Sequence, residues 1–334
     1  MSIKIPFVVF IVLLLAACGT QAPPTAVPST QTPMPTATAV PPTPTPFRII
    51  GYVTDAVIVE LLPFDKLTHI NYAFAIPNQD GSLKPMANSW KIDNLVRQAH
   101  EHNVKVLISV GGWGHDETFE ILATDPTARD RHVQELVALV EKHNLDGVDM
   151  DWEYPDPVSI SPNSSQNYVK LMQALGVEMR ARGKLLTAAV VALGEYGHGV
   201  DPVVFDEVDF LNLMVYDRGS EGHHSSLEFA QESLAFWRGR GLPLEKTVLG
   251  VPFYGRPNYA TYKQLVAADP ANAFTDEAEW HGRIEYYNGI PTIQQKTRLA
   301  LEQASGLMIW TLEHDTQDET SLLQAIYQTV HNTP

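Results

Sequence analysis

The chain has 334 residues, of which 44% are hydrophobic and 19% are charged, and its formal net charge is −16 at pH 7. This composition provides enough apolar material for one large hydrophobic core or two small ones. The net negative charge argues against a phosphate-binding surface, because nucleic-acid binding depends on Lys and Arg side chains, so no nucleic-acid partner is expected.

The N-terminal segment has the pattern of a secretory signal. Lys4 precedes an apolar run from Ile5 to Ala17, and small residues lead to Cys18. The run is shorter than the roughly 20 residues that a membrane-spanning helix needs, and it fits the apolar region of a signal peptide. The stretch LAAC resembles a bacterial lipoprotein signal, in which the cysteine is lipidated after cleavage. We therefore expect a lipoprotein-type signal over residues 1–18, with an ordinary signal and an incidental cysteine as the alternative.

Residues 19–46 are rich in Pro, Thr and Ala, carry no charge and show no hydrophobic periodicity. Such a segment cannot bury a core and is typical of an extended, polyproline-like linker. A linker beside a lipid anchor indicates a folded head held off a membrane. We expect the protein to lie outside the cytoplasm, lipid-anchored to the cell membrane or secreted.

From residue 47 onward, short β-rich runs alternate with longer amphipathic runs, as in a parallel sheet covered by helices. The eight β-rich runs are RIIGYV, LTHINYAFA, VKVLISVGG, LDGVDMDWE, LLTAAVVA, VDFLNLMVYD, TVLGVPFYG and GLMIWTLE. Helices are expected over residues 90–102, 128–143, 166–182 and 320–330.

Eight strands are the number that closes a parallel α/β barrel. The competing fold is an open doubly wound sheet, but no turn of the form G-x-G-x-x-G follows the first run. The sequence therefore predicts a single α/β domain over residues 47–334, a (β/α)8 TIM barrel.

The fourth run, NLDGVDMDWEYP, carries four acids. Residues two apart in a strand point the same way, so Asp149, Asp151 and Glu153 share a face opposite Val, Met and Trp. A solvated acidic patch would not alternate with such residues. The acids are expected to point into the barrel, with Glu153 at the carboxyl end of the strand, where barrel active sites lie. Repulsion by Asp151 is expected to raise the pKa of Glu153, as suits a general acid.

The run DGVDMDWE is similar to the D-x-x-D-x-D-x-E signature of glycoside hydrolase family 18, the chitinase-like enzymes. Other family motifs have counterparts in SVGGW (109–113), LMVYD (213–217), VPFYGR (251–256) and MIWTLE (308–313). Their order matches that of the family's third, sixth, seventh and eighth strands. The resemblance covers nearly all of residues 47–334.

The resemblance implies a retaining, substrate-assisted mechanism, in which the 2-acetamido oxygen of the sugar is the nucleophile. It implies that Glu153 protonates the glycosidic oxygen and later activates water. Asp151 would orient the acetamido group and share a proton with Asp149. Tyr216 would donate its hydroxyl to the acetamido oxygen, and Asp146 would be structural.

The resemblance also implies further contacts with the sugar. They are Trp310 as an apolar floor, Met214 and Asp217 as pocket lining, Tyr254 and Arg256 as polar contacts, and Trp113, Phe74 and Tyr52 as walls. Tyr52, Phe74 and Tyr254 could instead be ordinary core aromatics. The histidine pairs at positions 100 and 102 and at 223 and 224 lack a metal-binding arrangement and are expected at the surface. No metal or other cofactor is predicted.

The implied substrate contains N-acetylglucosamine, which leaves chitin, chitooligosaccharides, N-glycan cores and peptidoglycan open. Residues 257–305 are too few for the large α+β insertion of some family members, so we expect an open groove and an endo-acting monomer. The alternatives are a cell-envelope N-acetylglucosaminidase that acts on peptidoglycan and a non-catalytic lectin. Lectins of this fold usually lack the acid that is present here as Glu153.

Overall fold

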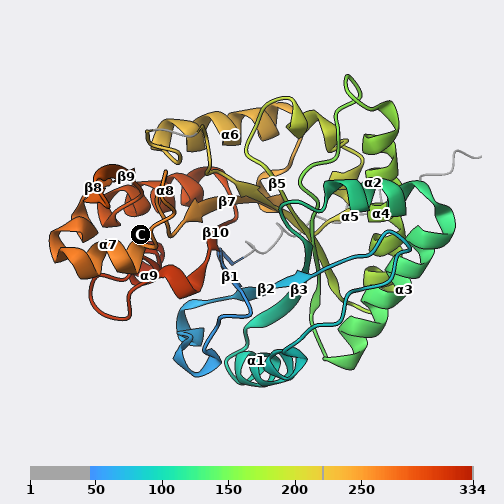
Figure 1. The fold of residues 1–334 in the computed structure, drawn as a ribbon, viewed down its shortest axis with the longest axis horizontal. Coiled ribbons are helices and arrows are strands. Elements are labelled where there is room, and N and C mark those ends of the chain that lie inside the picture. Colours follow the sequence, from blue (N-terminus) through green and yellow to red (C-terminus); the bar gives the residue numbers. More distant parts are fainter. Residues whose placement is uncertain (1–45, 220–221, 333–334) are drawn as a thin grey trace, which may run out of the picture. The chain divides into compact units, whose positions relative to one another are not determined.

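The computed structural model describes residues 46–219 and 222–332, so Cys18 and the predicted signal peptide lie outside the described residues, as does the predicted linker up to residue 45. Eight parallel strands form a closed barrel (Figure 1). They are β1 (Arg48–Val53), β2 (His69–Ala75), β3 (Lys105–Gly111), β4 (Gly147–Asp151), β5 (Leu185–Val191), β6 (Phe210–Met214), β7 (Thr247–Pro252) and β10 (Gly306–Trp310). The predicted TIM barrel is confirmed, and each of the eight predicted runs contains one of its strands.

Helices surround the barrel (Figure 1). They are α1 (Ser89–Glu101), α2 (Asp116–Thr124), α3 (Pro126–Lys142), α4 (Pro162–Ala181), α5 (Val204–Glu207), α6 (Leu227–Gly239), α7 (Tyr262–Ala268), α8 (Ile290–Gln303) and α9 (Leu322–Asn332). The four predicted helices correspond to α1, α3, α4 and α9. Helix α4 starts four residues before the predicted Gln166, because Pro162 occupies its first turn, where the missing N–H costs nothing. No helix in the described ranges is long and apolar enough to cross a membrane.

The strands separate two apolar layers. Outward-facing residues such as Val148, Met150 and Trp152 pack against the helices. The Trp152 ring stacks on Phe119 of α2 at 5.1 Å, and its Nε1 donates to Asp116 at 2.9 Å. The barrel interior is filled by Ile50, Tyr52, Ala73, Ala189, Phe210, Met214, Val248 and Met308. The alternation predicted for the acidic strand is confirmed, since its apolar residues face the helices.

A small module lies between β7 and β10. It contains α7, the antiparallel strands β8 (Glu277–Trp280) and β9 (Arg283–Tyr286), and α8 (Figure 1). The predicted lack of a large insertion is confirmed. Strand β9 also pairs with the loop after β7, because Arg256 N donates to Tyr286 O at 2.9 Å and Tyr286 N donates to Arg256 O at 2.7 Å. The module therefore supports a loop at the carboxyl end of the barrel.

Candidate active site

Glu153 lies in the loop that follows β4. The sequence predicted a strand reaching Glu153, but β4 ends at Asp151. Pairing with β3 ends at Asp151 and pairing with β5 ends at Met150, so no neighbouring strand holds the next residues in an extended ladder. This correction places Glu153 just beyond the carboxyl end of the strand rather than within it.

Asp146 lies at the opposite end of the strand, where a structural residue was predicted. Its Oδ2 accepts hydrogen bonds from Val106 N and His100 Nε2, both at 2.8 Å. These contacts join the start of β4 to β3 and α1. Asp146 is therefore separated from the other three acids by the length of the strand.

Asp149 is fully buried and accepts four hydrogen bonds from four other strands. The donors are Tyr52 Oη at 2.5 Å, Ser109 Oγ at 2.8 Å, Thr187 Oγ1 at 2.6 Å and Asn212 Nδ2 at 3.1 Å. Ser109 and Thr187 are also its register partners in β3 and β5. Burial raises the pKa of Asp149, and the four hydrogen bonds oppose that rise. The proton that the family resemblance places between Asp149 and Asp151 stays a prediction.

Asp151 is 3% exposed, and its Oδ1 has no hydrogen-bond partner among the described residues. Burial raises its pKa well above the usual range, and the charges of Glu153 and Asp149 raise it further. An unsatisfied buried oxygen at the end of a barrel strand is available to an N–H group of a ligand.

Burial raises the pKa of Glu153 to about 7; the charge of Asp217 adds to this rise, and a hydrogen bond with Tyr154 opposes it. The sequence attributed the shift to Asp151. Burial is instead the main cause, and the repulsion between Asp151 and Glu153 raises the pKa of Asp151. A carboxyl group with a pKa near 7 is partly protonated at neutral pH and can act as a general acid.

Asp217 follows β6 and has a left-handed backbone conformation, with φ of 61°. Its N–H donates to His224 Nδ1 at 3.1 Å, and its Oδ1 pairs with Arg256 Nη1 at 3.0 Å. Burial alone would raise the pKa of Asp217, but contacts with His224 and Tyr254 and the charge of Arg256 hold it below its usual value. His224 is 1% exposed, so the prediction of a surface position was wrong for this residue. The buried imidazole accepts the Asp217 N–H and so stabilises this left-handed conformation.

Tyr216 also follows β6 and lies among buried groups. Its hydroxyl is 3.9 Å from Met308 Sδ, and its ring centroid is 6.2 Å from that of Tyr254. Met214 and Tyr254 are buried beside it. Burial raises the pKa of the Tyr216 phenol well above its ordinary value. The hydroxyl is therefore protonated at neutral pH and can donate a hydrogen bond.

Aromatic rings form the bottom of the site. Trp310, at the end of β10, lies 5.7 Å from Phe74 in a stacked arrangement and 5.5 Å from Tyr52. Tyr52 is only 1% exposed and lies beneath the site, as its alternative assignment to the core predicts. Trp113, beyond β3, is 79% exposed. A side chain at Gly112, whose φ is +84°, would come within 2.9 Å of the Phe74 ring, so this position favours glycine.

Residues 48–315 match the sequence profile of the glycosyl hydrolases family 18. The chain belongs to this family. It is 28% identical over 293 residues to Probable chitinase 2 of Drosophila melanogaster, covering 77% of this chain and 57% of that protein. It is 30% identical over 234 residues to a chitinase-like effector of Moniliophthora perniciosa, covering 61% of this chain and 53% of that protein. The chain thus spans little more than half the length of these two relatives.

The fold is also similar to that of a solved family 18 protein, the chitinase ChiB from the chitin utilization locus of Flavobacterium johnsoniae. The TM-score is 0.74 at 31% identity, covering 86% of this chain and 94% of that chain. The family match includes all eight barrel strands and the loops after β3, β4, β6 and β7. These comparisons support glycosidase activity.

The sequence did not identify some residues that shape this family 18 site. Thr187 and Asn212 hold Asp149, and the buried Glu285 of β9 accepts hydrogen bonds from Asn258 N at 2.9 Å and Ala260 N at 3.0 Å. Glu285 thereby fixes the loop after Arg256. A signal existed for the first two, since each is a lone polar residue within an apolar strand run. No comparable signal marked Glu285.

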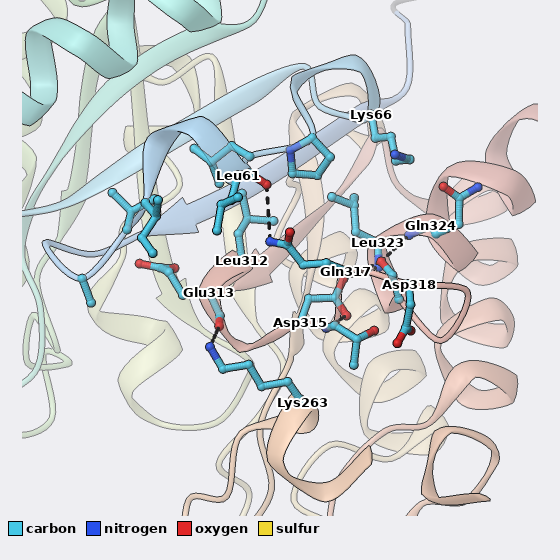
Figure 2. Close-up of a pocket in the computed structure, with 17 residues that line it drawn as sticks. Leu61, Lys66, Lys263, Leu312, Glu313, Asp315, Gln317, Asp318, Leu323 and Gln324 are labelled. Carbon is cyan, nitrogen blue, oxygen red and sulfur yellow. Dashed lines mark hydrogen bonds between the residues drawn. The ribbon is translucent and has the colours of Figure 1, made fainter. Parts of the chain in front are cut away.

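Two cavities lie near the loops of the barrel. One, of about 280 Å³, is lined by residues after β1 and β10 and by the start of α9, and Figure 2 shows Lys263 donating to Glu313 O within it. The described residues that line it include none of the four acids. The other, of about 170 Å³, is lined in part by Phe74, Lys84 and Met86 and so adjoins the aromatic floor. Within the described ranges, no three His, Cys, Asp or Glu side chains are grouped to hold a metal ion.

Proposed function

We propose that this family 18 chain is an endo-acting glycosidase that cleaves β-1,4 bonds next to N-acetylglucosamine in chitin or chitooligosaccharides. The observation that carries the proposal is the position of Glu153 in a loop just beyond Asp151, at the carboxyl end of β4, where burial raises its pKa to about 7. One carboxyl can thus be protonated at neutral pH while the neighbouring carboxyl keeps a free oxygen. This pair suits proton delivery combined with recognition of an amide group.

The nucleophile in this proposal belongs to the substrate. An ordinary retaining glycosidase needs two carboxyl groups roughly 5–5.5 Å apart on opposite sides of the bond. Asp149 and Asp151 lie on one face of β4, and Glu153 is two residues beyond Asp151, so the three acids do not flank a sugar. The acetamido oxygen of the bound sugar attacks C1 instead.

The first step breaks the glycosidic bond. Glu153 transfers its proton to the glycosidic oxygen as the acetamido oxygen forms a bond to C1, giving an oxazolinium ion. Asp151 accepts a hydrogen bond from the acetamido N–H, and Tyr216 donates one to the acetamido oxygen. In the second step the Glu153 carboxylate takes a proton from water, and the hydroxide adds to C1 and opens the ring. The proton that Glu153 takes from water replaces the one that it gave to the leaving sugar, so the protein is unchanged only after both steps.

Aromatic groups would bind the faces of the sugars. Trp310 and Phe74 would lie beneath the ring that carries the reacting C1, and the exposed Trp113 would offer a platform to a further sugar. The ion pair between Asp217 and Arg256 would supply polar contacts at the same end of the barrel.

Two other functions compete with this proposal. One is hydrolysis of peptidoglycan next to N-acetylglucosamine, and the other is sugar binding without cleavage. The presence of Glu153 favours an enzyme over a lectin. The deciding experiment incubates the purified protein with chitin hexamers and, separately, with purified peptidoglycan, and follows products by mass spectrometry. We expect shorter chitin oligomers. Peptidoglycan fragments alone would identify peptidoglycan as the substrate, and intact polymers in both samples would contradict hydrolase activity.

We further propose that Cys18 is lipidated and anchors the monomeric enzyme to a membrane outside the cytoplasm, with residues 19–46 as a spacer. The sequence LAAC followed by an uncharged Pro/Thr-rich segment supports this. Cys18→Ser should move the protein from the membrane fraction to the soluble fraction, while Thr20→Ser should not. Equal fractionation of Cys18→Ser and wild type would reject the anchor.

A further inference from the structure

Lys296 of α8 is a buried cation that the proposed reaction does not use. Its side chain is 0% exposed, and burial lowers its pKa to about 7. Asp276 and Glu228 are the acids whose charges act on it and oppose this shift. Burying an ammonium group costs several kcal/mol unless its protons are satisfied. The contacts of Lys296 are therefore informative.

Three acceptors surround the Lys296 ammonium. They are Ser225 O at 2.6 Å, Ser225 Oγ at 2.7 Å and Asn288 Oδ1 at 2.6 Å. Asn288 Nδ2 also donates to Ser225 O at 2.8 Å. An ammonium group has three protons, so this arrangement satisfies all of them. Two of the three bonds end on a single residue, Ser225, which is itself 1% exposed.

Ser225 closes the loop that carries two proposed site residues. Its Oγ donates to Val215 O, the residue immediately before Tyr216. The next residue back along the loop, His224, accepts hydrogen bonds from Asp217 N at 3.1 Å through Nδ1 and from Arg218 N at 3.1 Å through its carbonyl oxygen. The two ends of the loop are thus joined at Ser225 and His224. The hydrogen bonds from Lys296 to Ser225 connect these loop ends to α8.

We infer that Lys296 is a positioning residue for the proposed hydrolysis, because it fixes Ser225 and thereby holds Tyr216 and Asp217 at the acidic strand. This inference rests on the proposed function. A methionine of similar length would fill the same space without a desolvation cost, so stability alone does not account for a lysine here. The two hydrogen bonds that Lys296 donates to Ser225 account for a lysine at this position.

The test compares Lys296→Met and Ser225→Ala with Lys246→Met as a matched control. Lys246 precedes β7 at the opposite end of the barrel, and its Nζ donates to Phe205 O at 2.7 Å and Val208 O at 2.9 Å. A misplacement of about 1 Å at a reacting group can cost roughly 100-fold in rate. We expect Lys296→Met to lower kcat on chitin hexamers by at least about tenfold, and Lys246→Met to stay within about twofold.

A second readout separates positioning from a general loss of stability. Asp217 contributes to the raised pKa of Glu153, so displacing the loop should move the alkaline limb of the pH–rate profile to lower pH. Lys296→Met and Ser225→Ala should both show this shift. A lower kcat with an unchanged pH profile, or wild-type kinetics in both variants, would overturn the inference. Ser225→Ala keeps the test decisive if Lys296→Met does not fold, because it removes the link to Val215 without removing a buried charge.

Amide hydrogen exchange gives a readout that needs no substrate. Peptides covering residues 214–227 should exchange faster in Lys296→Met than in wild type and in Lys246→Met. If the wild type cleaves no sugar polymer, the proposed function fails, but the exchange difference still tests whether Lys296 holds the loop. Unchanged exchange over residues 214–227 in both Lys296→Met and Ser225→Ala would show that Lys296 does not hold this loop.

Discussion

The hydroxyl of Tyr52 on β1 donates a 2.5 Å hydrogen bond to Asp149 on β4, across the interior of the barrel. Both residues are buried, at 1% and 0% exposure. The Tyr52 ring also packs 5.5 Å from Trp310. The aromatic floor and the acidic strand are therefore parts of one packed unit, and a change in Tyr52 should affect both.

Tyr52→Phe should destabilise the protein, because it leaves a fully buried carboxylate with one donor fewer. Hydrogen bonds to charged groups contribute about 1.5–3 kcal/mol, and we expect a loss of that order in the free energy of unfolding. Urea denaturation at neutral pH measures it. Tyr72→Phe is the control, since the Tyr72 hydroxyl donates at 2.7 Å to the exposed Asp55. Equal losses in the two variants would mean that the hydrogen bond to Asp149 contributes no more to the free energy of unfolding than the bond to the exposed Asp55.

Glu153→Gln should lower kcat by at least about 100-fold, the lower range of general acid–base contributions. The amide has nearly the same shape but cannot deliver or take up the proton. Steady-state hydrolysis of chitin hexamers measures the change. Glu117→Gln, an exposed residue in the first turn of α2, should stay within about twofold of wild type. Activity of Glu153→Gln within threefold of wild type would reject Glu153 as the acid.

Glu153→Gln should also make the folded state more stable at alkaline pH. The pKa of Glu153 rises from 4.5 to about 7 on folding, so the folded state loses stability as pH rises through this window. Below pH 4.5 both states are protonated and the cost is absent; above about pH 7 it is on the order of 3 kcal/mol. Melting temperatures at about pH 4 and pH 8 should show the variant gaining only at the higher pH. No difference between the two pH values would contradict the raised pKa.

The alkaline limb of kcat/KM should lie near pH 7, where Glu153 loses its proton. Asp217→Asn should move this limb to lower pH, because the Asp217 charge disfavours ionisation of Glu153. A pH–rate profile of both proteins on a short chitin oligomer measures the shift. Asp209→Asn, at the amino end of β6, is the control and should leave the limb unchanged. A limb that moves to higher pH in Asp217→Asn would contradict the electrostatic contact.

The sequence was sufficient for the barrel, because each of the eight strands lies within a β-rich run and amphipathic runs lie between them. Helices α6 and α8 were not among the helices that it predicted. It was also sufficient for the alternation of the acids with Val148 and Met150. It could not predict that Thr187 and Asn212 contact Asp149, since those contacts depend on strand register across the barrel.

The sequence also did not predict that His224 and Lys296 are buried. A histidine or lysine within a polar stretch is usually exposed, whereas His224 and Lys296 are 1% and 0% exposed, and Lys296 donates to the residue after His224. The pKa of Glu153 was predicted in the correct direction from its neighbour Asp151. The cause was different: burial in the packed loop after β4 raises this pKa, and no local pattern of the sequence reveals that burial.

The mechanism predicts that the first product keeps the β-anomeric configuration. Attack by the acetamido oxygen inverts C1 once and attack by water inverts it again, so the net result is retention. Asp151→Asn and Tyr216→Phe should both slow the first step, because each removes a group that orients or polarises the acetamido group. A stable cyclic mimic of the oxazolinium ion should inhibit, since enzymes bind transition-state-like species more tightly than substrates. Time-resolved proton NMR of chitin hexamer cleavage reads the anomer directly. Fresh α-anomer as the initial product would mean inversion by a protein-held water, with Asp217 as the leading candidate for its base, and would rule out the substrate-assisted route.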